Sequence, residues 1–126
     1  MQKPWLKDWP WDTVVTINVG LCKEKDMRPQ ANPAGYEPAR QLWEHLRSED
    51  LTLHQALGVC RRAHQLSPFA LYNGNTFAAI GRTVVGDLLR RMPPDKAQVF
   101  RSIVGHYIAG TAGDEELEAA LKTVDT

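Results

Sequence analysis

Apolar side chains recur every three or four residues from residue 36 onward, and this spacing limits the chain to helical folds. Ala39, Leu42, Trp43 and Leu46 occupy positions i, i+3, i+4 and i+7, which places them on one face of a helix. A second stripe follows the Thr-Leu-His-Gln segment at 52–55, a capping box of the kind that starts a helix. The chain is therefore predicted to be all-α.

Further segments extend the same pattern toward the C-terminus. Ser-Pro at the start of segment 67–72 predicts a short turn of helix. Longer helices are predicted at 75–92, at 94–109 before a terminating glycine, and at 114–124, where the first turn is acidic as the helix dipole favours. Short loops between them predict a compact bundle of five or six helices covering residues 36–126.

Two glycines interrupt the apolar stripe of segment 75–92. A glycine inside a helix costs about 1 kcal/mol relative to alanine. Gly81 and Gly86 therefore predict places where another helix approaches closely.

The N-terminal third is less regular. Residues 1–12 combine prolines with tryptophans and are expected to form an extended arm. Residues 13–24 alternate as a strand would, yet also fit a helical stripe, so periodicity leaves both open. We favour a helix, because Asp12 is a good N-cap and the rest of the chain is helical, although the density of β-branched residues favours a strand. A strand here would need a second copy or another protein as its pairing partner. Residues 25–35 contain two prolines and a glycine and are predicted to be a loop.

Trp5, Trp9 and Trp11 stand close together in the arm and allow two interpretations. Large aromatic side chains are usually mostly buried, so the three could fold back over the core. Tryptophan is also enriched at the energetic centres of protein interfaces. On the second interpretation the arm binds a partner protein.

Composition restricts the classes of partner. Fifteen basic residues balance fifteen acidic ones, so the chain lacks the positive field that most nucleic-acid-binding proteins use. No apolar run approaches the roughly 20 residues needed to cross a bilayer, and we expect no membrane association. With two cysteines only, we expect free thiols and a cytoplasmic location.

Cys60 and His64 are the weak candidates for a metal site. They lie four residues apart on one predicted helix face, as two ligands of a transition metal could. Both also belong to the core-facing stripe, where cysteine acts as a small apolar side chain. The chain contains no CxxC or HExxH motif, so we expect neither a metal nor another cofactor.

Arginines make the central helices locally basic. The candidates for binding an anion are Arg61, Arg62, Arg82, Arg90 and Arg91. If they converged on one face, they would suit an acidic protein, an anionic ligand or single-stranded nucleic acid. Acidic residues elsewhere balance them, so a solvated surface of mixed sign is the simpler interpretation.

Residues 51–72 resemble part of a helix-turn-helix unit of the AraC type. The shared pattern is A-H-x-x-S-P-F at residues 63–69, and the resemblance implies DNA recognition by the second helix. The predicted first helix is longer than that motif allows, residues 64–66 lack a turn glycine, and Asn73-Gly74 would end the second helix after one turn. DNA binding is therefore a secondary hypothesis.

No catalytic motif supports an enzyme. The sequence has no G-x-S-x-G and no spaced pair of carboxylates in polar surroundings. We therefore expect a non-enzymatic protein-interaction or adaptor module, with another protein as its partner. The alternative is a small regulatory domain that binds nucleic acid or an anionic ligand, and the sequence leaves open whether the chain forms a homo-oligomer.

Overall fold

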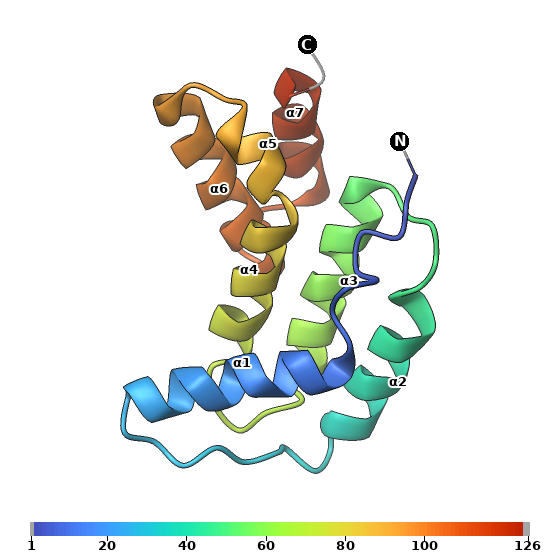
Figure 1. Cartoon of the computed structure of the whole chain (residues 1–126), viewed down its shortest axis with the longest axis vertical. Helices are drawn as coiled ribbons and strands as arrows, with labels where there is room; N and C mark the ends of the chain where they lie inside the picture. The colour runs from blue at the N-terminus through green and yellow to red at the C-terminus, as the bar shows by residue number, and fades with distance from the viewer. Residues whose placement is uncertain (1, 125–126) are drawn as a thin grey trace.

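The computed structural model describes residues 2–124, and this part of the chain contains seven α-helices and no strand. The helices are α1 (Trp11–Glu24), α2 (Tyr36–Leu46), α3 (Leu53–Leu66), α4 (Asn73–Val84), α5 (Gly86–Arg90), α6 (Pro94–Ala109) and α7 (Asp114–Val124). Figure 1 shows α1 lying across one end of the bundle formed by the others. The prediction of an all-α fold is confirmed.

Residues 13–24 form a helix, as favoured above, and this helix starts two residues earlier than expected. Its inward stripe is Val14, Asn18 and Cys22, a spacing of four that a helix brings onto one face. Asn18 Nδ2 donates to the Leu71 carbonyl at 2.8 Å and to Thr76 Oγ1 at 3.1 Å. These bonds attach α1 to the start of α4 and satisfy a buried amide.

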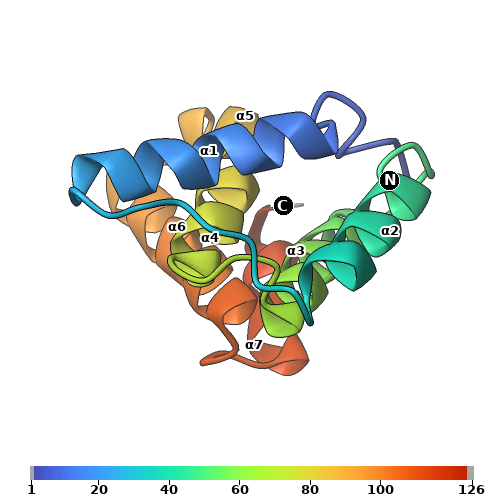
Figure 2. The same ribbon diagram turned by 90° about the horizontal axis from the view of Figure 1, so that it is seen from below.

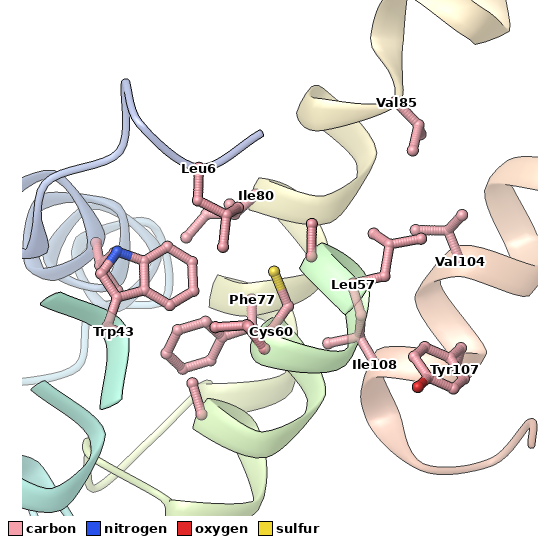
Figure 3. Close-up of a cluster of buried hydrophobic side chains, with 14 of the residues drawn as sticks. Leu6, Trp43, Leu57, Cys60, Phe77, Ile80, Val85, Val104, Tyr107 and Ile108 are labelled. Atoms are coloured by element: carbon pink, nitrogen blue, oxygen red, sulfur yellow. The ribbon is translucent and has the colours of Figure 1, made fainter. Parts of the chain in front are cut away.

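Helix α3 occupies the centre of the bundle and packs against α2, α4, α6 and α7. The predicted capping box starts it: Gln55 N donates to Thr52 Oγ1 at 3.1 Å, and Thr52 N donates to Gln55 Oε1 at 2.9 Å. Leu57 and Cys60 are fully buried. Figure 3 shows them between Trp43 on one side and Val104 on the other.

The predicted turn of helix in segment 67–72 is wrong. Ser67 ends α3 in the left-handed region at φ 52°, and the segment then runs beside the loop before α2, with Ala70 N donating to the Gln30 carbonyl at 2.9 Å. Asn73 exchanges two hydrogen bonds with the backbone of Phe69, at 2.8 and 3.0 Å. Helix α4 therefore begins at Asn73, before the predicted start, and the second helix implied by the helix-turn-helix resemblance does not begin at Ser67.

The predicted helix at 75–92 is divided between α4 and α5 at Val85. Gly81 fits the prediction of close approach, because a Cβ there would lie 2.3 Å from Ile108 Cδ1 of α6. Gly86 does not, because the nearest atom to such a Cβ is an Arg90 side-chain nitrogen at 3.6 Å. Its place is the first residue of α5, where the chain changes direction.

Helices α6 and α7 form a hairpin. Gly110 ends α6 at φ 88°, as predicted for a glycine C-cap. Figure 2 shows α7 on the side of the bundle opposite α1. Within the described residues, no helix combines the length and apolar character needed to span a membrane.

We predict that Gly35→Ala destabilises the fold by about 1–3 kcal/mol or more, the usual cost of overpacking. A Cβ at Gly35 would lie 1.9 Å from the Leu66 carbonyl oxygen and 2.4 Å from that of Ser67, and backbone cannot move aside as a side chain can. Urea unfolding measures the change in free energy of unfolding.

Gly20→Ala is the matched control, because Gly20 lies inside α1 and a Cβ there would meet nothing within 4 Å. It should stabilise the protein by up to about 1 kcal/mol through helix propensity. Equal effects of the two substitutions would contradict the packing of α2 against the end of α3.

Candidate functional site

An apolar groove of about 600 Å³ lies between α6 and α7. Its apolar lining consists of Met92, Val99, Phe100, Ile103, Ala119 and Ala120. The two alanines of α7 are small, so a partner's backbone can approach that wall closely. The groove is thus an open, mostly apolar surface next to a helical hairpin.

Val99 is the side chain that makes this groove unusual. It is 61% exposed, whereas Phe100 beside it is buried in the core. The inward stripe of α6 includes Phe100, Val104 and Ile108, and Val99 lies outside it. An apolar residue away from the core-facing stripe was the sequence signal for this site.

The rim of the groove carries charge of both signs. Asp95 and Lys96 lie on α6, and Glu116 lies on α7. The two acidic residues thus outnumber the one basic residue among the charged groups that line the groove.

A cluster around His54 attaches α7 to α3. His54 Nε2 lies 2.9 Å from Asp114 Oδ1, and His54 Nδ1 contacts Glu118 Oε1. Tyr107 of α6 donates its hydroxyl to Asp114 Oδ1 at 2.8 Å, and the Arg61 guanidinium lies 4.7 Å from the centre of the Tyr107 ring. Only the protonated imidazole can donate from both ring nitrogens, so the contacts favour the charged form.

The pKa values in this cluster shift accordingly. Partial burial lowers the pKa of His54, but the hydrogen bonds that its ring donates to Glu118 and Asp114 outweigh this effect, so the pKa is raised. The bonds from His54 and Tyr107 lower the pKa of Asp114. Burial, with help from Asp114, raises the pKa of Tyr107 to about 12. The cluster thus has a structural role. The carboxylates of Asp114 and Glu118 stabilise the charged form of His54, and Asp114 stabilises the protonated form of Tyr107.

The tryptophans of the arm fold back onto the protein. Trp11 is 4% exposed and stacks on Phe69, with ring centres 5.9 Å apart. Trp9 is partly buried, and its carbonyl accepts from Trp43 Nε1 at 2.7 Å. Trp5 is also partly buried against the core. Trp11 is thus enclosed by its own chain, while Trp5 and Trp9 keep some exposed surface.

The candidate arginines come from three helices and from the residue after α5. Arg61 and Arg62 lie on α3, Arg82 on α4, Arg90 on α5, and Arg91 directly follows α5. Arg61 donates to the Ala112 carbonyl at 3.0 Å, and Arg90 pairs with Asp87. Arg82 lies against Gly105 of α6, where a Cβ would be 2.4 Å from its Nη2. Arg62 and Arg91 are exposed, so the arginines are divided among several places.

Cys60 and His64 lie in the core-facing part of α3. Burial raises the pKa of the Cys60 thiol to about 12, which keeps it protonated and a poor metal ligand. No group of three or more His, Cys, Asp or Glu side chains among residues 2–124 is placed to hold a metal ion. Cys22, the other free cysteine, is buried in α1.

We predict that His54→Gln reduces stability more at about pH 5.5 than at about pH 8.5. A histidine whose pKa is raised on folding stabilises the folded state at pH values below its pKa in the unfolded state. This stabilisation is lost as the pH rises through its pKa in the folded state. Asp114, with its lowered pKa, stays ionised at the lower pH. Because the side chains of Asp114 and Glu118 are 74% and 50% exposed, the difference should be about 0.5 kcal/mol.

Urea unfolding of both proteins at the two pH values measures this difference. Tyr107, whose pKa is raised to about 12, keeps its proton at both pH values. An equal loss of stability at both pH values would show that the two carboxylates do not bind the protonated ring.

Comparison with known proteins supplies no family for the chain. No protein-family model matches it, and no curated protein and no solved structure gives a significant match. Its function must be inferred from the surfaces and contacts described above.

Proposed function

We propose that the protein is a non-enzymatic interaction module whose α6–α7 groove receives the apolar face of a helix from a partner protein. The observation that carries the proposal is Val99, 61% exposed on the wall of an apolar groove. Leaving a large aliphatic side chain in water forgoes about 1.5–3 kcal/mol of burial. A partner that covers Val99 would recover part of that free energy.

The shape and charge of the groove indicate the kind of partner. A groove between two helices suits an amphipathic helix, which presents apolar side chains at positions i, i+3, i+4 and i+7. The volume of about 600 Å³ accommodates several such side chains. Because Asp95 and Glu116 outnumber Lys96 on the rim, we expect basic residues beside the apolar stripe of the partner helix.

The His54 cluster supports a non-catalytic role. Both ring nitrogens of His54 are engaged by carboxylates of α7, and the Tyr107 hydroxyl is engaged by Asp114. A general base needs a nitrogen or oxygen that can reach a substrate proton. These groups instead stabilise α7, the wall on which the groove depends.

Binding to nucleic acid is the less favoured alternative. Phosphate backbones are held by several cations on a common face. Here Arg61, Arg82 and Arg90 contact groups of their own chain on three different helices. The arm remains a second candidate surface through Trp5 and Trp9, although their packing against the core supports a structural contribution.

Val99→Glu tests the proposal. The tagged protein is first used to isolate partners from an extract of its source cells. The affinity of an isolated partner, or of its helix as a synthetic peptide, is then measured by calorimetry. We expect the substitution to weaken binding about tenfold or more, because a carboxylate would have to be desolvated beside an acidic rim. Gln65→Glu, at an exposed position of α3, is the matched control and should leave affinity unchanged.

Two outcomes would contradict the proposal. A helical partner that binds Val99→Glu as tightly as the unmodified protein would place the interface elsewhere. A chain that light scattering shows to be a dimer, and that Val99→Glu makes monomeric, would show that a second copy covers the groove.

A further inference from the structure

A second hollow opens at the end of the bundle away from α1. It has a volume of about 410 Å³ and is lined by residues of the N-terminal segment, the start of α3, α5 and the residue after it, and α7. Figure 1 shows α5, α7 and the N-terminal segment toward the end of the molecule away from α1. The body of its wall is apolar and consists of Trp5, Leu53, Leu88, Leu121 and Val124.

Two cations line this hollow. Lys3 comes from the N-terminal segment, and its Nζ lies 4.0 Å from the centre of the Trp5 ring. Arg91 follows α5 and lines the same hollow. Neither side chain pairs with a carboxylate in the described part of the chain, whereas neighbouring Arg90 pairs with Asp87. Lys3 and Arg91 are therefore available to an anion.

The remaining charges of the hollow offset one another. His54 and Glu118 both line it, and they contact each other. Lys3 and Arg91 also line an adjoining hollow of about 480 Å³, which adds Lys7 and two aspartates. Asp87 pairs with Arg90, which leaves Asp8 beside Lys3, Lys7 and Arg91, so positive charge is in excess at the shared boundary.

We propose that this hollow binds a small amphiphilic anion, an aromatic or aliphatic acid whose apolar body packs against Trp5 and the leucines while its acid group lies between Lys3 and Arg91. The volume falls within the range of about 300–1,000 Å³ of small-molecule sites, which combine apolar walls with a few polar groups. Arginine suits a carboxylate or sulfonate because its guanidinium donates two parallel hydrogen bonds. Trp5 and Arg91, which the sequence offered as separate candidates, belong to one site here.

This site is distinct from the docking groove. Glu118 and Leu121 of α7 line the hollow, whereas Glu116 and Ala119 line the groove. Each site can therefore be removed while the other is kept, and neither proposal depends on the other.

Fluorescence titration with 1-anilinonaphthalene-8-sulfonate tests the proposal, with neutral N-phenyl-1-naphthylamine as its uncharged counterpart. The double variant Lys3→Gln and Arg91→Gln replaces both cations by neutral, polar and somewhat shorter side chains. We expect it to bind the sulfonate about tenfold more weakly or worse, as for the loss of hydrogen bonds to a charged group. Affinity for the neutral probe should change less than about twofold, and decanoate should compete with the sulfonate for the unmodified protein.

Two controls separate this hollow from the groove and from general charge effects. Arg62→Gln removes an exposed arginine from α3, and Val99→Glu disrupts the groove. Both should bind the sulfonate as the unmodified protein does. In a ¹H–¹⁵N spectrum, the indole signal of Trp5, assigned by its loss in Trp5→Phe, should shift on addition of the sulfonate.

The proposal is overturned by any of three results. One is the absence of sulfonate binding to the unmodified protein, and another is undiminished binding by the double variant. The third is loss of binding in Val99→Glu without a shift of the Trp5 signal, which would place the probe in the groove.

Discussion

The fold depends on the burial of α3 between its neighbours. Leu57 and Cys60 are enclosed by side chains from α2, α4 and α6. Gly81 lets α4 approach so closely that a methyl group there would meet Ile108. Removing these apolar side chains from water is the main favourable contribution to folding. The helices at the surface are positioned by this burial.

Helix α7 is held more weakly than the central helices. Leu117 is the α7 side chain that the core buries completely within the described residues, and the His54 cluster supplies its polar attachment to α3. Exposed ion pairs contribute little each, so α7 is a candidate for local opening at modest free-energy cost. The docking groove and the second hollow both use this helix as a wall, which makes its attachment relevant to both.

Sequence reasoning succeeded where local chemistry decides structure. The capping box at Thr52 and the glycine stop at Gly110 act within a few residues, and both are present. It failed at 67–72 and at Val85, where contacts with distant parts of the chain decide the course of the backbone. Ala70 hydrogen-bonds to Gln30, forty residues earlier, and no local pattern encodes such a contact.

The candidate sites were visible in the sequence only in part, for the same reason. Tryptophan density marked the arm but could not distinguish core packing from docking, because a large amphipathic ring serves both. The helix dipole accounts for the acidic first turn of α7 in the sequence, but it does not reveal that Asp114 of that turn and Glu118 beyond it both contact His54 across the bundle. Val99, by contrast, is an apolar residue outside the core-facing stripe of α6. Together with the apolar groove that it lines, this exposed valine is the observation on which the proposed docking of a partner helix rests.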